Sequence, residues 1–408
     1  MKSRAYDAKK DREAAVRIWR EVGWIDGPES EKGFDVFLSA GSARLAEVDG
    51  GPECMVNTCP GTLRYMGEEV PTCCVSGVTT SHVAKRQGLA SRLLAECLAA
   101  EAEGGSSLAA LGAFDQGFYD RLGFGTGGYD HWCTFDPAQL VVPTPTASPK
   151  RLTIEDAERI HRSRLRRERG HGAITVTSSS MTHAEILWSD NGIGLGFAGD
   201  DREITHHVWL TTKSPGGAPY RVSWMAYETK EQFLELMGIL RSLADQVTSI
   251  RMREPAGIQL QDLLWQPFRY RRLTREAKHQ QLMTASAYNQ FRILDLEACI
   301  RQMRLDGKAV SFHLELLDPI RELAPEKAQW KGVGGEYTVH LGADSTLEPG
   351  RTGSLPTLRT TVNAFTRLWL GVQPASTLSW TDRLEAPTDL LTSLDRLRLP
   401  RPTSDWEF

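Results

Sequence analysis

Apolar positions in the first 136 residues follow two periodicities. The apolar residues Leu89, Leu93 and Leu94 recur at helical spacing, and a Gly-Gly pair follows at 104–105, as expected just past the end of a helix. Shorter runs rich in β-branched and other apolar residues, bounded by glycine-containing turns, are typical of strands. Strands are expected at 43–47, 54–66, 73–80 and 107–114. The pattern predicts one mixed α/β domain over residues 1–136.

The remaining chain divides at a proline-rich stretch. Residues 137–149 carry proline and small polar residues too densely for a helix or a central strand, so we expect a linker there. Residues 150–278 again alternate between helix and strand patterns, which predicts a second α/β domain. Residues 279–408 contain more strands and turns and form the third expected domain. Its strands are expected at 309–317, 335–341 and 359–362. The expected fold class is therefore α+β.

Length, charge and cysteine usage narrow the class of protein. A chain of 408 residues favours two or three domains over a single core. The 48 Lys and Arg residues nearly balance the 52 Asp and Glu, for a formal charge of −4, so no global attraction for nucleic acid or an anionic membrane is expected. No apolar run is long enough to span a membrane, and the first residues lack the apolar segment of a secretory signal. We therefore expect a cytoplasmic protein whose seven cysteines are reduced.

The stretch from Val75 to Leu94 carries the clearest chemistry. It reads as a strand, a short basic loop containing Gly88 and an amphipathic helix. The first turn of a helix has unpaired N–H groups that favour an anion, and Gly88 removes the side chain that would block close approach. Lys85 and Arg86 add positive charge beside them. The preceding strand has backbone groups able to pair with an extended, amide-bearing ligand such as pantetheine. The alternative is an anion-free turn with solvated basic residues.

These residues bear a family resemblance. The loop Lys85-Arg86-Gln87-Gly88-Leu89-Ala90 resembles the pyrophosphate loop of the GNAT acetyltransferases, although Lys85 departs from the Gln or Arg of that pattern. The segment from Phe118 to Gly125, about 30 residues further on, strengthens the resemblance. It implies acetyl-CoA as co-substrate and no metal. The residues expected to bind acetyl-CoA are Val78, Thr79, Thr80, Lys85, Arg86, Gln87, Gly88, Leu89, Ala90, Ser91, Phe114 and Asp115.

Nearly the whole chain resembles one branch of that superfamily, the Eis (enhanced intracellular survival) proteins, which acetylate aminoglycosides and lysine side chains. The likeness also rests on the segments 227–233, 291–295 and 368–371 and on the final Trp-Glu-Phe. It implies two tandem GNAT-like mixed-sheet domains, a third domain similar to sterol carrier proteins, and a homo-oligomer such as a hexamer. The second domain has no basic glycine loop before its helix, so we expect it to bind no CoA and to serve as scaffold.

The resemblance also implies the catalytic groups. Tyr119 stands in the place of the general acid, and the reference pKa of a phenol, near 10, keeps it protonated at neutral pH. The backbone N–H of Val78 is expected to polarise the thioester carbonyl. The main-chain carboxylate of Phe408 is expected to accept the proton of the amine. The alternatives are a packing role for Tyr119 and a frayed tail, although the aromatic residues Trp406 and Phe408 favour an apolar site.

The acceptor expected from this chemistry is a primary amine, as in aminoglycosides, polyamines or lysine side chains. A cationic acceptor favours acidic and aromatic groups in its pocket. The substrate-binding candidates are Trp24, Asp26, Glu29 and Glu407. Phe114 stands where the family usually has serine, which predicts a differently shaped channel. Cys54, Cys59, Cys73 and Cys74 lie on adjacent expected strands rather than on turns, so buried thiols are favoured over a metal site.

Two other classes of function stay open at this point. A carrier of lipids or other hydrophobic ligands, suggested by the third domain, would bind acyl chains and release no thiol from acetyl-CoA. A CoA-binding sensor without turnover would be unaffected by Tyr119→Phe.

Overall fold

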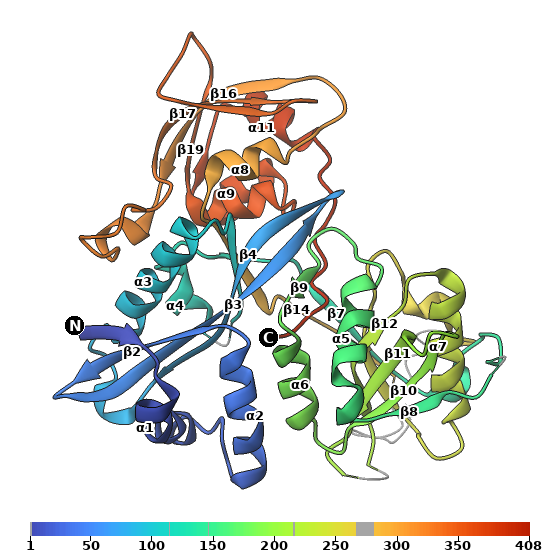
Figure 1. Cartoon of the computed structure of the whole chain (residues 1–408). Helices are drawn as coiled ribbons and strands as arrows, with labels where there is room; N and C mark the ends of the chain where they lie inside the picture. The colour runs from blue at the N-terminus through green and yellow to red at the C-terminus, as the bar shows by residue number, and fades with distance from the viewer. Residues whose placement is uncertain (1, 114, 146, 215–216, 267–280) are drawn as a thin grey trace.

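The chain folds around three β-sheets with helices packed against them, which confirms the expected α+β class (Figure 1). The computed structural model describes residues 2–113, 115–145, 147–214, 217–266 and 281–408.

The first sheet is built mainly from the N-terminal third of the chain. In spatial order its strands are β1 (Lys2–Ala5), β2 (Ser42–Val48), β3 (Gly51–Tyr65), β4 (Glu68–Thr80), β5 (Leu108–Gly112), β15 (Asn289–Ile293) and β6 (Gly125–Thr126), and β9 (Ile174–Val176) pairs with β3. The helices of this region are α1 (Ala8–Glu21), α2 (Pro28–Ser39), α3 (Leu89–Glu103) and α4 (Gln116–Asp120). The strands β4 and β5 are parallel, and α3 supplies the crossover connection that a parallel pair requires.

The second sheet repeats this arrangement. In spatial order its strands are β14 (Leu282–Ser286), β7 (Asp130–Phe135), β13 (Ile250–Arg253), β12 (Tyr220–Ala226), β11 (Ile204–Thr211), β10 (Ile193–Ala198) and β8 (Lys150–Leu152). The helices of this region are α5 (Ala157–Arg166), α6 (Ser179–Leu187) and α7 (Lys230–Ser242). Here β12 and β13 form the parallel pair, and α7 connects them.

The third sheet comes from the C-terminal part of the chain. In spatial order its strands are β18 (Thr346–Pro349), β17 (Gly335–Leu341), β16 (Val310–Leu317), β19 (Thr357–Thr361) and β20 (Leu384–Glu385). Its helices are α8 (Leu296–Arg301), α9 (Val362–Trp369), α10 (Ala375–Thr381) and α11 (Thr388–Asp395). After α11 the chain runs back to the centre of the molecule, where Figure 1 marks the C-terminus beside α6.

Two strands cross between the first and second sheets. The strand β7 follows β6 of the first sheet after residues 127–129, but it lies in the second sheet between β13 and β14. Conversely, β15 follows β14 of the second sheet after residues 287–288, but it lies in the first sheet between β5 and β6. Each sheet is therefore completed by a strand from the other region. Strand pairing crosses the boundaries expected at residues 136 and 278, and the limits of the three domains stay a prediction.

The proline-rich stretch is packed rather than free where the structure describes it. Residues 137–145 contain a 3₁₀ turn at Pro137–Gln139 and an isolated bridge between Leu140 and Leu264. The backbone N–H of Val141 donates to the carbonyl of Leu263 at 2.7 Å. These bonds attach the stretch to the second region.

Helix α3 forms as the sequence predicts. Leu89, Leu93 and Leu94 are buried against the strands of the first sheet, and Gly104 ends the helix. Helix α6 was not anticipated. It has only 9 residues and packs against both α2 and α5, so its apolar residues are not confined to one face and leave a weak helical periodicity.

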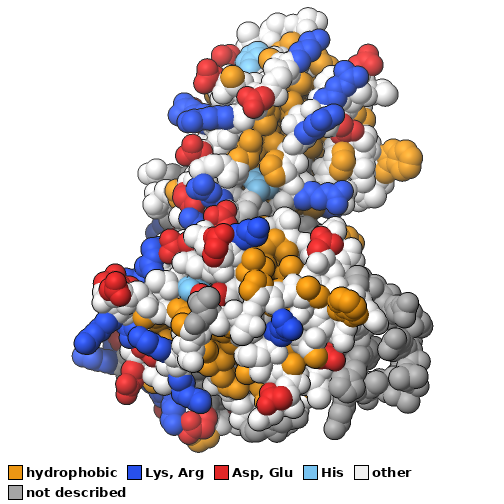
Figure 2. All heavy atoms as spheres, turned by 90° about the vertical axis from the view of Figure 1, so that its right-hand side faces the viewer, with side chains coloured by type: hydrophobic (Ala, Val, Ile, Leu, Met, Phe, Trp, Pro, Cys, Tyr) orange, Lys and Arg blue, Asp and Glu red, His pale blue; other side chains and the backbone are white. Residues whose placement is uncertain are grey.

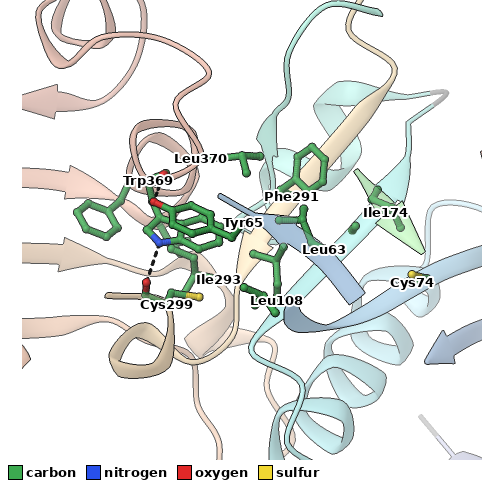
Figure 3. Close-up of a cluster of buried hydrophobic side chains, with 14 of the residues drawn as sticks. Leu63, Tyr65, Cys74, Leu108, Ile174, Phe291, Ile293, Cys299, Trp369 and Leu370 are labelled. Carbon is green, nitrogen blue, oxygen red and sulfur yellow. Dashed lines mark hydrogen bonds between the residues drawn. The ribbon is translucent and has the colours of Figure 1, made fainter. Parts of the chain in front are cut away.

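The largest apolar core joins the first sheet to the third. Figure 3 shows Tyr65 of β3 lying flat against Trp369 of α9, with ring centroids 4.2 Å apart and ring planes at 9°. The Tyr65 hydroxyl donates to the Trp369 carbonyl at 2.9 Å, and the Trp369 indole N–H donates to the Cys299 carbonyl at 2.8 Å. Both rings are fully buried with their polar atoms satisfied, so the third sheet is firmly packed on the first.

The outer surface carries both signs of charge. Figure 2 shows Lys and Arg side chains interspersed with Asp and Glu over the face that it draws, with apolar side chains between them. Within the described residues, no helix combines the length and apolar character needed to cross a membrane.

Candidate active site

The strands β4 and β5 separate in the middle of the first sheet. Their parallel pairing runs from Thr72 opposite Leu108 to Val75 opposite Leu111 and goes no further, although β4 continues to Thr80. A β-bulge lies at the same place, because Thr58 pairs with Val75 and the next residue of β3 back along the chain, Asn57, pairs with Gly77. Ser76 is the extra residue. Bulges re-aim backbone groups and often lie next to active sites.

The N–H of Val78 points into the space left by this separation. In an antiparallel pair, hydrogen-bonded and non-hydrogen-bonded residue pairs alternate along the strands. The N–H of Ser81 donates to the carbonyl of Glu53 at 2.9 Å, so this pair is hydrogen-bonded. Counting back along β4, Val78 opposite Val56 falls in a non-hydrogen-bonded pair. Its N–H and carbonyl therefore face away from β3, on the side from which β5 has separated.

A loop with two left-handed residues leads from β4 into α3. Arg86 has φ 62° and Gly88 has φ 72°, and Gly88 is the N-cap of α3 without a side-chain capping bond. The N–H groups of the first turn, at 89–91, therefore lie open to a ligand. An added Cβ on Gly88 would lie 3.4 Å from the Arg92 guanidinium, which itself donates to the Gln87 carbonyl at 3.0 Å. The loop thus forms a small, positively charged cradle, as the sequence predicts for an anion site.

A pocket of about 410 Å³ borders the space between β4 and β5. It is lined by Trp19, Trp24, Phe37, Val75, Ser76, Gly77, Val78, Gly112, Tyr119, Met181, Glu185, Trp188, Tyr288, Glu407 and Phe408. The three residues predicted to be catalytic, Val78, Tyr119 and Phe408, are thus brought to one place from β4, α4 and the C-terminus. Seven of the lining side chains are aromatic, so the walls are mainly apolar with polar tips.

Tyr119 is held by α4 and its cap. Asp115 precedes this helix and its carboxylate accepts from the N–H of Phe118 at 3.2 Å, which fixes the start of the helix. Tyr119 is only 2% exposed and packs edge-on against Phe118 and Phe124. Burial raises the pKa of Tyr119 well above its ordinary value, with smaller contributions from Asp115 and Tyr288. The phenol is therefore protonated at neutral pH, as a proton donor must be.

The C-terminal tail is bound along its last residues. The Trp406 indole is 1% exposed, donates to the Glu185 carboxylate at 2.8 Å, and lies under the Arg164 guanidinium at 3.6 Å from the ring centroid. Asp405 accepts two hydrogen bonds from Arg167, at 2.7 and 2.9 Å. These bonds hold Asp405 and Trp406 and thereby keep the end of the chain at the pocket.

Of the four substrate-binding candidates, two line the pocket and two do not. Trp24 lines the pocket, whereas Asp26 and Glu29 do not: Asp26 accepts from the Ser30 hydroxyl at 2.8 Å, and Glu29 is exposed and pairs with Lys32. Glu407 also lines the pocket, but its carboxylate is bound to two arginines. Phe114 lies outside the described residues.

Sequence reasoning missed the residues that α6 and β15 bring to the site. Met181 and Glu185 of α6 and Trp188, which follows it, line the pocket, as does Tyr288 before β15. The spacing of Met181, Glu185 and Trp188 at four and three residues was the available signal. Burial raises the pKa of Glu185, which forms an ion pair with Arg164.

The cysteines lie away from solvent. All seven are free and buried, and burial raises the pKa of Cys54 to about 11. Over the described residues, no group of three or more His, Cys, Asp or Glu side chains is arranged to hold a metal ion.

Comparison with protein families identifies the N-terminal region. Residues 5–127 match the family model described as an acetyltransferase (GNAT) domain. These residues include the bulge, the loop before α3 and Tyr119. No curated protein matches the chain.

Solved structures resemble the chain over its full length. A probable N-acyltransferase from Enterococcus faecalis V583 shares 19% identity, with a TM-score of 0.79 over 100% of this chain and 99% of the other. A GCN5-related N-acetyltransferase from Anabaena variabilis ATCC 29413 shares 14% identity at a TM-score of 0.79, over 100% of each chain. Eis1 from Mycobacterium abscessus shares 18% identity at a TM-score of 0.77, again over 100% of each chain. At these identities the likeness concerns the fold.

Proposed function

Because residues 5–127 match the acetyltransferase (GNAT) domain model, we propose that the chain transfers an acetyl group from acetyl-CoA to a primary amine bound beside Phe408. The observation that carries the proposal is the convergence of three groups on one pocket: the outward-facing N–H of Val78, the protonated phenol of Tyr119 and the end of the chain at Phe408. An acyl-CoA co-substrate follows from the family. Acetyl as the acyl group is part of the proposal.

The residues present fit this co-substrate. The open edge of β4 beyond the bulge offers backbone groups to the amides of pantetheine, and the cradle of Arg86, Gly88 and the first turn of α3 suits a pyrophosphate. Acyl-CoA supplies an activated thioester. Thr79 and Thr80 lie on the same edge, and Lys85, Gln87, Leu89, Ala90 and Ser91 belong to the loop and the helix start, so we retain them as binding residues.

The chemistry proposed is direct attack in a ternary complex. The Phe408 carboxylate accepts a proton from the ammonium, and the amine nitrogen then forms a bond to the thioester carbon. The Val78 N–H donates to the oxygen on which negative charge develops. As the carbon–sulfur bond breaks, Tyr119 gives its proton to the departing sulfur. The nitrogen loses a second proton as the amide forms, and this proton restores the Tyr119 phenol, while the proton held by Phe408 is released to solvent.

The pocket favours an amine with one positive charge and an apolar body. The side-chain carboxylates that line it are both ion-paired, Glu185 with Arg164 and Glu407 with Arg221 and Arg253. The ammonium would meet the terminal carboxylate together with the faces of Trp19, Trp24 and Trp188. Aminoglycosides, polyamines and lysine side chains stay in the proposal as primary amines. They are ranked below an aromatic monoamine, because a polycation would need further free carboxylates.

The remaining parts of the proposal concern the rest of the chain. The second sheet repeats the strand order of the first, which supports a degenerate GNAT-like domain. A third domain similar to sterol carrier proteins and a homo-oligomer, as a hexamer, are carried over from the resemblance.

The first experiment measures release of CoA from acetyl-CoA with four amines: a phenylalkyl monoamine, a polyamine, an aminoglycoside and a lysine peptide. We compare the untagged chain, the chain extended by a few residues after Phe408, and Tyr119→Phe. We expect the monoamine to give the highest kcat/KM. The extension should abolish turnover, and Tyr119→Phe should lower kcat by about 10²-fold, the usual contribution of a general acid.

Each result bears on a separate part of the proposal. Equal activity of the extended chain removes Phe408 as the base but leaves the acetyltransferase. An unchanged kcat in Tyr119→Phe removes the assigned acid. Binding of acetyl-CoA without turnover of any amine contradicts the proposed function and favours a sensor.

A further inference from the structure

The second sheet repeats the local feature that forms the acyl-CoA groove of the first. Its parallel pair β12–β13 ends at Arg221 opposite Arg251, although β12 continues to Ala226. A β-bulge lies at the same place, because Leu210 pairs with Val222 and Trp209 pairs with Trp224, which leaves Ser223 as the extra residue. The two sheets thus share a bulge followed by a separation of the parallel strands.

The space opened in the second sheet is occupied by the chain itself. A pocket of about 140 Å³ lies between the free end of β12, the end of β13 and the C-terminal tail, and Thr403 and Asp405 form part of its wall. The tail enters this space directly after Pro402. There the N–H of Thr403 donates to the His171 carbonyl at 2.8 Å. Because the two sheets have the same strand order, the tail lies at the place where the first sheet would hold the pantetheine arm of CoA.

The loop before α7 differs from the loop before α3, because a side chain of the protein caps the start of α7. Thr229 caps α7 and accepts from the N–H of Gln232 at 3.3 Å, so a side chain of the protein satisfies the start of the helix. Gly88, the cap of α3, makes no such bond. The second sheet thus keeps the groove without an open anion cradle.

Each of the last four residues of the tail contacts another part of the molecule. Trp406 points to α5 and α6, where it meets Arg164 and Glu185, and Phe408 reaches the pocket of the first sheet. The acids on either side of Trp406 also bind arginines of the second region: Asp405 binds Arg167, and Glu407 binds Arg253 at 2.6 Å.

Arg253 contacts the tail at two points. Its guanidinium donates to the Ser404 carbonyl at 2.9 Å as well as to the Glu407 carboxylate, and only 13% of its side chain is exposed. Arg221 adds a second bond to Glu407 at 2.5 Å from a more exposed position. Partly buried, charge-assisted bonds to two points of a short segment fix both its position and its direction.

We infer that the separation of β12 and β13 is a binding site for the chain's own C-terminal segment, and that Arg253 is a positioning residue for the carboxylate of Phe408. The inference rests on the proposed function, in which that carboxylate is the base. Glu407 directly precedes Phe408, so loss of the Arg253 bond leaves Glu407 to the more exposed Arg221 and gives the terminal carboxylate more freedom to rotate away from the amine. The second region thereby acts on the reaction without touching a substrate.

The first test compares Arg253→Ala with Arg251→Ala. Arg251 lies on the same strand, is exposed and stands over the same Trp132 ring, so it is a matched control. We expect Arg253→Ala to lower kcat for amine acetylation about 10-fold or more, the order of effect that a misplaced group produces, with the KM for acetyl-CoA unchanged. Arg253→Lys should recover part of kcat, and Arg251→Ala should behave as the parent. Parental kcat in Arg253→Ala overturns the inference.

The second test needs no turnover. Carboxypeptidase should release Phe408 faster from Arg253→Ala than from the parent and Arg251→Ala, with circular dichroism confirming that all three are folded. Equal release rates overturn the tail site. If the parent acetylates no amine, the proposed function fails, while this comparison still decides whether the second sheet holds the tail.

Discussion

At the scale of single residues, the backbone at Gly88 has the most direct link to the co-substrate. Its φ of 72° lies in the left-handed region, and the space beside it is bounded by Arg92. Gly105, just after α3, has a φ of 99° and no neighbour within 4 Å. The two glycines thus share backbone strain on substitution but differ in their distance from the expected pyrophosphate.

We therefore expect Gly88→Ala to raise the KM for acetyl-CoA about 5- to 10-fold, because a left-handed alanine costs about 1–2 kcal/mol and shifts the loop. Gly88→Ala and Gly105→Ala should lower the melting temperature by similar amounts. Gly105→Ala should leave the KM for acetyl-CoA unchanged. Steady-state kinetics and thermal unfolding of both variants test this. A KM that rises equally in both would argue that the loop before α3 does not bind the co-substrate.

At the scale of elements, the exchanged strand β7 begins with a buried acid. Asp130 is 3% exposed, accepts weakly from the Asn289 side chain at 3.5 Å, and lies 3.8 Å from Arg253. Burial raises the pKa of Asp130 to about 6, against the opposing effect of Arg253. The folded protein therefore binds this proton more tightly than the unfolded chain, in which a carboxyl titrates near 4.

The sign of the resulting pH dependence follows from this difference. Stability from Asp130 is fully present below about pH 4 and is lost as the pH rises through about 6, a change of about 2–3 kcal/mol. Asp130→Asn cannot lose a proton, so at pH 7.5 it should unfold at a higher denaturant concentration than the parent, and the gap should close near pH 4. Urea unfolding across this range measures it. A gap that widens toward pH 4 would contradict the buried acid.

The elements also show which structural features can be predicted from local sequence patterns. The face of α3, the glycine at its end and the strand at 335–341 follow from periodicity and turn residues, and each lies where the sequence predicts it. The loop at 85–88 and Tyr119 were found because their signals are local. Glu185 and Trp188 were not, because their spacing from Met181 is a weak signal in a helix of 9 residues and α6 joins the site through its packing on α2.

At the scale of the whole molecule, the exchange of β7 and β15 escaped the sequence analysis for the same reason. Apolar alternation predicts that a segment is a strand, but it does not name the partner strand. Residues 279–408 are expected to form the third domain, yet β15, which lies within them, pairs with β5 and β6 of the first sheet. The N-terminal region is thus not a closed unit.

A fragment of residues 1–136 should consequently fail to fold by itself. It lacks β15, which lies between β5 and β6, and it exposes β7 without its partners β13 and β14. Unpaired strand edges of this kind aggregate. We expect the fragment to be insoluble or to lack the near-ultraviolet circular dichroism of packed aromatics, whereas the full chain is folded. A soluble, cooperatively unfolding fragment would contradict this.

The two crossings that exchange the strands also limit how the enzyme can move. Residues 127–129 and 287–288 pass between the sheets side by side, since the N–H of Gly127 donates to the carbonyl of Asn289 at 2.8 Å. Each connection spans at most about 3.6 Å per residue, so neither has slack for a hinge. The first two sheets therefore cannot swing apart to admit an amine or close over it. Under the proposed function, an amine acceptor therefore enters an opening that is already formed.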